Sequence, residues 1–260
     1  MNAKDVILAR KLGGGGGGGT EITDGIVVKA YRQPDNWIQE VDFYCESGVT
    51  PNSVFKGAEY RFLTTINYKN PLTTISVSFA DGRNALTTFP DFSIITSLGR
   101  GSFYGCALLN GVITLPLCTS IGDSSFRGTN ITELSAPKCI SVDSSGLRAG
   151  ALKKVYLPKL NKFIGGNVFY GCTSLETVQL GSIGNAVEQI SNNDFSGCTQ
   201  TGLTITVYTT SAYADTALTN IRNGATNATI ILKASEDTTY NGVAYAAGET
   251  MITSTAEAVA

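Results

Sequence analysis

The amino-acid sequence predicts a mainly β protein, folded as a curved solenoid of about six or seven stacked repeats. A large apolar residue recurs at spacings of 24, 24, 23, 21, 22 and 26 residues. A short strand-like stretch with alternating apolar residues follows most of these recurrences. Outside the repeats, the N-terminal end has the pattern of a β-hairpin, and the C-terminal end has that of an α/β unit. Because one repeat cannot bury its apolar side alone, stacking the repeats produces a continuous core.

Residues 1–19 form a distinct N-terminal segment. A short apolar stretch flanked by basic residues precedes an uninterrupted run of seven glycines, Gly13–Gly19. We expect a docking helix joined to the rest by a flexible tether, and a disordered tail is the alternative. The run is not a phosphate-binding loop, because Thr20 follows it where such a loop has lysine. The apolar stretch is too short for a signal peptide, so we expect release by another route, such as lysis, or a chain that has lost its signal.

Residues 20–48 have the pattern of an N-terminal cap. Two β-rich runs, residues 26–31 and 37–44, flank the turn formed by residues 34–36, which is typical of a hairpin. Such a hairpin would cover the open end of the solenoid. Trp37 and Tyr31 flank the turn, where they would either stack on a sugar or be buried under the cap, and burial is the expected use of a lone Trp.

Residues 49–210 carry the repeats. A glycine that permits a positive φ follows each recurring apolar residue within three positions. The recurring residues are Phe55, Phe79, Phe103, Phe126, Leu147, Phe169 and Phe195. The strand-like stretches are clearest at residues 131–137, 152–158, 175–181 and 203–207, while residues 109–116 fit with one extra residue. The unit of Phe79 fits more loosely and that of Phe55 is the weakest. We expect all these residues to share one core, in which each buried Phe stabilises the fold by ~1.5–3 kcal/mol.

Residues 211–260 depart from the repeat and predict an α/β cap and a tail. Residues 212–221 have a helical pattern that ends at Asn223 and Gly224. Residues 228–233 are typical of a strand, and the pair Asn241 and Gly242 is typical of a hairpin turn. We expect the residues after Met251 to be frayed.

The repeat resembles the BspA-like (Treponema-type) class of bacterial leucine-rich repeats over roughly residues 49–208. The resemblance is carried by IGGNVFYGCTSLETVQL at residues 164–180, IGDSSF at 121–126 and LKKVYLP at 152–158. It implies a leucine-rich repeat solenoid and a role in binding, since BspA-like proteins are associated with host matrix proteins. The chain also resembles leucine-rich repeat proteins encoded near tail genes in phages and prophages of gut bacteria. This second resemblance rests on shorter sequence segments. These segments are the N-terminal segment with its glycine run, DGIVV at 24–28, EVDFY at 40–44 and NGATNATI at 223–230.

Five of the six cysteines occupy repeated positions. Cys106, Cys172 and Cys198 share one position, and Cys118 and Cys139 share another just after a strand. Neighbouring rungs of a solenoid lie ~5 Å apart, which is close enough for a disulfide between Cys118 and Cys139. We favour buried thiols that pack as small apolar groups and keep the disulfide as the alternative.

Composition and motifs exclude several classes of function. The chain has no histidine and a formal net charge of −2, so it lacks His-based catalytic groups and the basic excess of a nucleic-acid binder. No apolar run is long enough for a membrane helix, and no cysteine spacing indicates a metal site. No pair of carboxylates has the pattern of a glycosidase, and the Gly-x-Ser-x-Gly motif is absent. Asp123 and Asp143 lie in matching turns, where we expect them to cap the backbone. We therefore expect a non-catalytic protein without cofactor or metal.

The outward positions of the predicted strands form a candidate ligand-binding face on the concave side. The candidate residues are Glu133, Ser135, Lys154, Tyr156, Thr177, Gln179, Thr204 and Thr206. Tyr156 beside Lys154 is the best anchor, because aromatic residues are frequent hot spots, whereas an ordinary solvated sheet face is the alternative for any single residue.

The leading hypothesis for function is a phage or prophage tail-associated protein, present in the virion, that binds a surface glycan or protein. Residues 1–19 would dock it to the particle, and a homo-oligomer is compatible by analogy with tail fibres. The alternative is a BspA-type adhesin on the bacterial cell surface that binds host matrix proteins. A third hypothesis, a structural spacer, predicts no saturable ligand.

Overall fold

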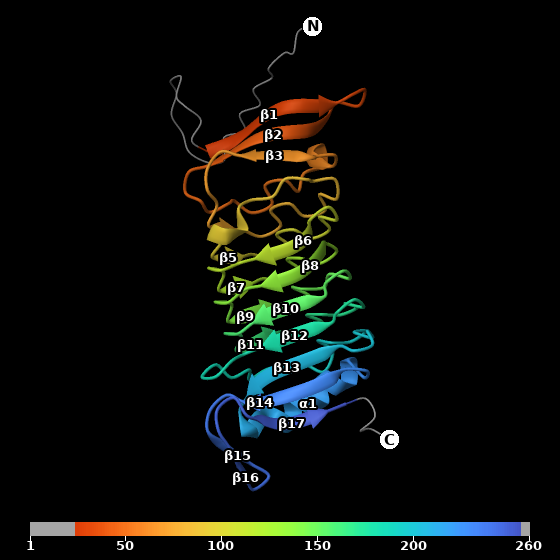
Figure 1. The fold of residues 1–260 in the computed structure, drawn as a ribbon. Coiled ribbons are helices and arrows are strands. Elements are labelled where there is room, and N and C mark those ends of the chain that lie inside the picture. The colour runs from red at the N-terminus through yellow and green to blue at the C-terminus, as the bar shows by residue number, and fades with distance from the viewer. Residues whose placement is uncertain (1–23, 256–260) are drawn as a thin grey trace.

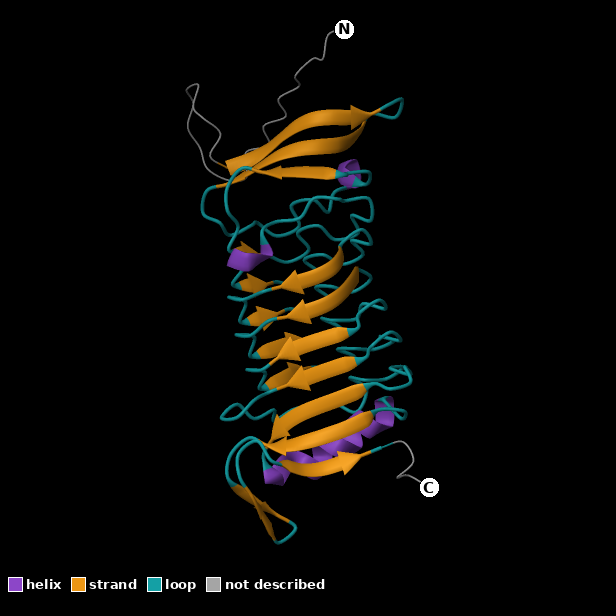
Figure 2. Cartoon of the chain, viewed as in Figure 1, coloured by secondary structure: helices purple, strands orange, loops and turns teal. Residues whose placement is uncertain are grey.

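The computed structural model describes residues 24–255, whose repeats stack into one column (Figure 1). The predicted docking segment, residues 1–19, lies outside the described residues. The described chain is mostly β, with one α-helix near its C-terminal end (Figure 2). The predicted mainly β solenoid, with a hairpin cap at one end and an α/β cap at the other, is confirmed.

The largest sheet has seven strands and contains the strands that the sequence predicts. In spatial order it consists of β17 (Thr250–Ser254), β14 (Thr229–Ala234), β13 (Thr204–Thr209), β12 (Thr177–Leu180), β10 (Lys154–Leu157), β8 (Asn130–Ser135) and β6 (Asn110–Thr114). All neighbours are parallel except β17, which is antiparallel to β14. The parallel arrangement follows from the solenoid, because each strand is reached after one full circuit of the chain.

A second, five-stranded sheet runs along another wall of the column and was not predicted. It consists of β11 (Lys162–Ile164), β9 (Ser141–Asp143), β7 (Ser120–Ile121), β5 (Ser97–Leu98) and β4 (Thr74–Ile75). These strands have two or three residues each, with one buried side chain apiece in β4, β5, β7, β9 and β11. Alternation cannot be recognised in so short a segment, so the sequence pattern does not reveal them.

The recurring apolar residues form the third wall. All seven are fully buried, including Phe55, the weakest member of the pattern. This wall has no strand, yet its turns are joined by backbone hydrogen bonds. The amide of Phe126 donates to the carbonyl of Gly146 at 3.0 Å, and the amide of Phe55 donates to that of Phe79 at 3.0 Å. The turns are therefore in register along the column, and the predicted common core is confirmed.

The N-terminal cap is the predicted hairpin. Strands β1 (Asp24–Arg32) and β2 (Trp37–Cys45) are antiparallel, and β3 (Thr65–Tyr68) pairs in parallel with β2. This three-stranded sheet does not continue into the seven-stranded one, because the intervening segment contains Pro90, which has no amide to donate. One 3-10 turn, Phe92–Ile94, lies in this intervening segment, and another, Ala58–Tyr60, precedes β3. The expected burial of Trp37 is only partial: its ring is half-buried, with its centroid 5.8 Å from that of Phe62.

The C-terminal cap contains the predicted helix, α1 (Ser211–Gly224), which crosses over between the parallel strands β13 and β14. The hydroxyl of Tyr213 accepts from the amide of Ile190 at 2.6 Å and donates to the carbonyl of Ile190 at 3.1 Å. The helix thus satisfies backbone groups at the end of the repeats.

The last part of the chain is more ordered than expected. Strands β15 (Thr238–Tyr240) and β16 (Val243–Tyr245) form the predicted hairpin around Asn241 and Gly242, whose φ angles are 49° and 78°. The expectation that residues after Met251 fray is wrong for residues 252–254, because β17 pairs with β14 as far as Ser254, while residues 256–260 lie outside the described residues. Met251 lies in β17 and is buried, which gives this strand an apolar anchor.

Candidate functional site

All eight predicted site residues lie on four adjacent strands of the seven-stranded sheet (Figure 1). The strand register arranges them in two rows. One row is Glu133, Lys154, Thr177 and Thr204. The other row is Ser135, Tyr156, Gln179 and Thr206. The structure therefore brings side chains from four repeats onto one surface.

The alternation of each strand keeps this surface separate from the core. Leu134, Val155, Val178 and Ile205 lie between the site residues in sequence and are buried. Because successive side chains of a strand point to opposite faces, burial of this set leaves the site residues on the outer face. Tyr156 is 43% exposed, so much of its ring is accessible to a partner.

A shallow hollow of about 240 Å³ lies on the outer face. Six of the predicted residues line it: Glu133, Ser135, Lys154, Tyr156, Thr177 and Gln179. Thr204 and Thr206 lie on the next strand and are not part of its lining. Val112 of β6 also lines the hollow and was missed by the sequence analysis, although it is 64% exposed.

Val112 escapes the pattern because its strand is irregular. The register between β6 and β8 shifts between Gly111 and Val112, and Gly111 has a φ of 78°. The extra residue expected in segment 109–116 lies instead on β8, where Thr132 is unpaired between Ile131 and Glu133. The irregularity brings Val112 opposite Glu133, so that an exposed apolar side chain borders the hollow.

The two charged residues in the lining neutralise each other. Lys154 Nζ donates to Glu133 Oε1 at 2.9 Å across the neighbouring strands. The hydrogen bond to Glu133 and the charge of that carboxylate raise the pKa of Lys154. Among the described residues that line the hollow, Glu133 is the single carboxylate. The hollow thus offers apolar surface with hydroxyl and amide groups, and it lacks the second carboxylate that glycoside hydrolysis uses.

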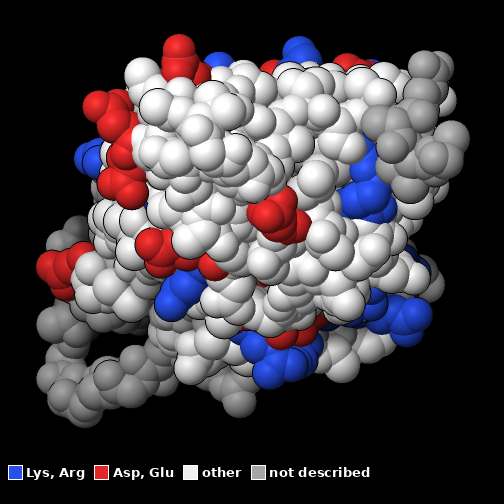
Figure 3. All heavy atoms as spheres, turned by 90° about the horizontal axis from the view of Figure 1, so that it is seen from below, with Lys and Arg blue, Asp and Glu red and all other residues white. Residues whose placement is uncertain are grey.

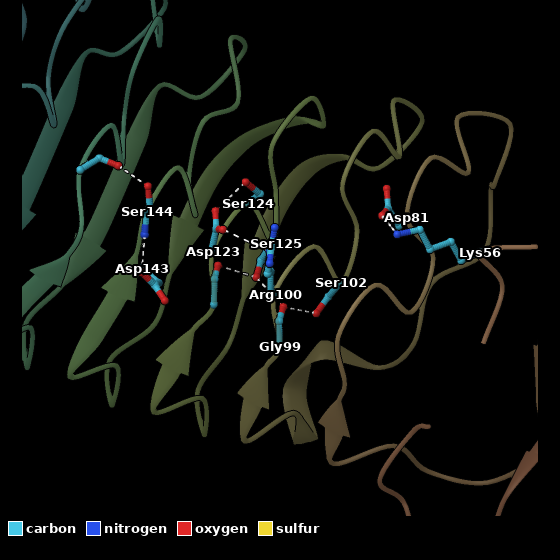
Figure 4. Close-up of polar contacts among 12 residues, drawn as sticks. Lys56, Asp81, Gly99, Arg100, Ser102, Asp123, Ser124, Ser125, Asp143 and Ser144 are labelled. Atoms are coloured by element: carbon cyan, nitrogen blue, oxygen red, sulfur yellow. Dashed lines mark hydrogen bonds and ion pairs between the residues drawn. The ribbon is translucent and has the colours of Figure 1, made fainter. Parts of the chain in front are cut away.

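The acidic residues of the matching turns have structural partners (Figure 4). Asp143 Oδ1 accepts from the amide of Ser144 at 2.7 Å, as predicted for a backbone cap. Asp123 differs, because its Oδ1 accepts from the hydroxyl of Ser124 at 2.7 Å and its Oδ2 lies 3.4 Å from Nε of Arg100.

Comparison with models of known protein families identifies the family of the repeats. The family described as BspA type leucine-rich repeat region matches in six copies, over residues 49–148, 73–201 and 141–235. These ranges together cover most of the chain. The chain belongs to the BspA-type leucine-rich repeat family. Repeats of this family are typically non-catalytic and occur in binding and adhesion modules. A search of curated proteins and a search of solved structures found no match.

In this BspA-type solenoid, the five cysteines of the repeats are buried thiols. The predicted thiols are confirmed, and no disulfide joins Cys118 to Cys139. Each donates to a backbone carbonyl; Cys118 Sγ, for example, lies 3.1 Å from the carbonyl oxygen of Ser120. Burial raises the pKa of Cys118 to about 11 and that of Cys139 to about 12. These thiols fill the core and are poor nucleophiles.

Two further features concern residues 24–255. In this part of the BspA-type chain, no three Cys, Asp or Glu side chains are grouped so that they would bind a metal ion. Over the same residues, no helix combines the length and apolar character needed to span a bilayer.

Proposed function

We propose that the chain is a non-catalytic recognition protein that binds a surface glycan or protein through the outer face of β6, β8, β10 and β12. The observation that carries this proposal is the hollow of about 240 Å³ between Tyr156 and Val112. A half-exposed aromatic ring beside an exposed apolar side chain is a typical anchor for a partner. Neutral polar groups from Ser135 and Gln179 would orient that partner by hydrogen bonds.

The charge distribution supports a partner that is recognised by shape and neutral contacts. Glu133 and Lys154 neutralise each other within the hollow. At the C-terminal end, acidic and basic side chains are scattered among uncharged residues (Figure 3). Because Glu133 and Lys154 neutralise each other, we expect binding to the strand face to depend weakly on salt, in contrast to binding that rests on unpaired exposed charges.

The test is a titration of labelled protein against intact gut bacteria and, in parallel, against immobilised fibronectin and fibrinogen. Tyr156→Ala should weaken saturable binding by about tenfold, because truncation of an aromatic hot spot costs this much or more. Val243→Ala is the matched control, since Val243 is 53% exposed on β16, outside the hollow. Absence of saturable binding to all targets would favour the structural spacer and refute the proposal.

The biological setting that we propose is a phage or prophage tail, with a bacterial surface adhesin as the alternative. Support for the tail comes from the glycine run and from the resemblance of the flanking segments. Binding to one group of bacteria, competed by its purified envelope glycan, would support the tail setting. Binding to the matrix proteins and not to bacteria would favour the adhesin.

A separate experiment tests the role proposed for residues 1–19. Deletion of this segment should abolish incorporation into particles while leaving the binding of the isolated protein unchanged. Unchanged incorporation would refute the docking role.

A further inference from the structure

A row of large polar side chains runs along the turn wall, on the opposite side of the backbone from the buried rings. Each member directly follows one of the recurring apolar residues. The four central members are Tyr104, Arg127, Arg148 and Tyr170, which we call the turn row. The amide of Gly105 donates to the carbonyl of Arg127 at 2.8 Å, and the amide of Gly128 donates to that of Arg148 at 3.1 Å. These hydrogen bonds place members of the turn row on consecutive rungs.

Each arginine of the turn row stacks on a tyrosine. The guanidinium carbon of Arg127 lies 5.4 Å from the ring centroid of Tyr104, and that of Arg148 lies 4.4 Å from the ring centroid of Tyr170. The two arginines therefore lean toward opposite neighbours, one toward the N-terminal rung and one toward the C-terminal rung. Stacking orients the planar guanidinium groups and leaves their N–H groups at the rim free to bind an anion.

Other cations of the same wall are already neutralised (Figure 4). Lys56 Nζ lies 3.4 Å from Asp81 Oδ2, and Arg100 Nε lies 3.4 Å from Asp123 Oδ2. Among residues 24–255, no carboxylate forms an ion pair with Arg127 or Arg148. The uncompensated positive charge of this wall is thus concentrated in the middle of the turn row.

A hollow of about 440 Å³ opens beside the N-terminal half of the turn row. Tyr104 and Arg127 line it together with three serines, Ser53, Ser78 and Ser124. The ion pair of Lys56 with Asp81 and the side chain of Arg100 complete its charged lining. These serines have positive φ angles of 54–57°. Ser53 and Ser78 belong to successive turns, and the turn of Gly101 lies between those of Ser78 and Ser124. Hydroxyl groups beside an aromatic ring and a guanidinium suit a ligand that carries both hydroxyl groups and negative charge.

We propose that the turn row and this hollow bind an acidic polysaccharide. Carboxylate or sulfate groups would accept paired hydrogen bonds from Arg127 and Arg148, while sugar rings lie against Tyr104 and Tyr170. The rungs repeat at ~4.8 Å, which is close to the advance of one sugar residue in an extended chain, so that successive residues meet successive rungs. This surface lies on a different wall from the strand face, and its function is independent of the one proposed for that face.

The experiment titrates the full chain with four probes by calorimetry at low and at raised salt. The probes are polygalacturonate oligosaccharides for carboxylate, chondroitin sulfate oligosaccharides for sulfate, neutral malto-oligosaccharides, and a single-stranded DNA oligonucleotide. Binding of one or both acidic glycans, and not of the neutral one, supports the proposal and identifies the anionic group. Tighter binding of DNA than of either acidic glycan, or no binding of any probe, overturns it.

Variants separate this site from general charge attraction. The double variant Arg127→Gln/Arg148→Gln should weaken acidic-glycan binding by about tenfold or more, because it removes the charge-assisted hydrogen bonds. Lys138→Gln/Lys159→Gln changes the net charge equally at two exposed lysines outside the turn row and should leave the affinity within about twofold. Equal losses in the two double variants would overturn the proposal.

Two further variants test the stacking and the separation from the strand face. The double variant Tyr104→Ala/Tyr170→Ala should weaken acidic-glycan binding without changing the net charge. Circular dichroism of this variant is the control for folding. Tyr156→Ala should leave acidic-glycan binding unchanged. If the tyrosine variant retains full affinity, the stacking part of the proposal is refuted.

Discussion

The backbone of Gly99 passes so close to Gly122 that a β-carbon on Gly122 would lie 2.7 Å from the carbonyl carbon of Gly99. The two glycines follow β5 and β7 at equivalent positions of neighbouring repeats. The amide of Gly122 donates to the carbonyl of Leu98 at 2.8 Å at the same place. The close stacking of rungs at this corner therefore requires a residue without a side chain.

We predict that Gly122→Ala destabilises the protein by about 1–3 kcal/mol, because the added methyl group must push two backbone segments apart. Gly150→Ala is the control, since a β-carbon there would meet no atom within 4 Å. It should change the free energy of unfolding by about 0.5 kcal/mol or less. Urea denaturation of the two variants measures both values. Equal stability of both variants would contradict the close approach.

Asp194 gives a prediction about pH. Its side chain is fully buried, with Oδ2 accepting from the amide of Ser191 at 2.6 Å and Oδ1 from that of Val168 at 3.2 Å. Burial raises the pKa of this carboxyl to about 6, against the opposing effect of the two hydrogen bonds. The folded state therefore binds this proton more tightly than the unfolded state, whose pKa is about 4. Its contribution to stability falls as the pH rises from about 4 to about 6 and is constant above that.

The measurement compares the wild type with Asp194→Asn, which is neutral at every pH. The stability of the wild type relative to the variant should fall by about 2 kcal/mol between pH 4 and pH 7, which is most of the effect that a pKa difference of two units allows. Urea denaturation at a series of pH values gives the difference directly, and other titrating groups cancel in it. A difference that does not vary with pH would mean that the pKa of Asp194 is not raised.

The parts of this fold that recur at long intervals could be predicted from sequence. Phe126 and Phe169 are recognisable because each repeat needs one large buried side chain at the same position. The strands β10 and β12 alternate over four residues, which is just long enough for a period of two. The outward positions followed from this alternation.

Contacts between repeats could not be predicted in the same way. Lys154 pairs with Glu133, 21 residues earlier, only because the register sets these two side chains opposite each other. Val112 required knowledge of the register shift between β6 and β8, and β17 is a short strand whose pairing depends on the edge of β14. The turn row is visible once the repeats are aligned, but the stacking of Arg148 on Tyr170 depends on which neighbour each side chain turns toward.

We predict that truncating a buried ring of the repeat costs far more stability than truncating the exposed ring that directly follows it. Phe169→Ala should destabilise the protein by about 3–5 kcal/mol, because it leaves a cavity next to Phe195, whose ring centroid lies 5.0 Å away. Tyr170→Ala should cost about 1 kcal/mol or less, since this ring is 42% exposed and loses mainly its contact with Arg148. Thermal and urea denaturation of the pair measure the contrast. Comparable losses would contradict the inward and outward orientations of these neighbours.

The buried thiols predict that the repeats resist alkylation. Burial raises the pKa of Cys106, Cys139 and Cys172 to about 12, and the thiolate is the reactive form. At pH 8 the thiolate fraction of a group with a pKa near 11, such as Cys118, is about one in a thousand. We therefore expect these thiols to stay unlabelled by iodoacetamide in the native protein and to be labelled after unfolding in urea.

Thr173→Cys provides the control, because position 173 is exposed and directly follows the buried Cys172. Mass spectrometry should find rapid labelling at position 173 and none at Cys172 in the same native molecule. Because no disulfide joins the repeat cysteines, a reducing agent should leave the Tm unchanged. Rapid labelling of Cys118 or Cys139 in the native protein would contradict the burial of these thiols. A fall in Tm on reduction would instead indicate a disulfide between them.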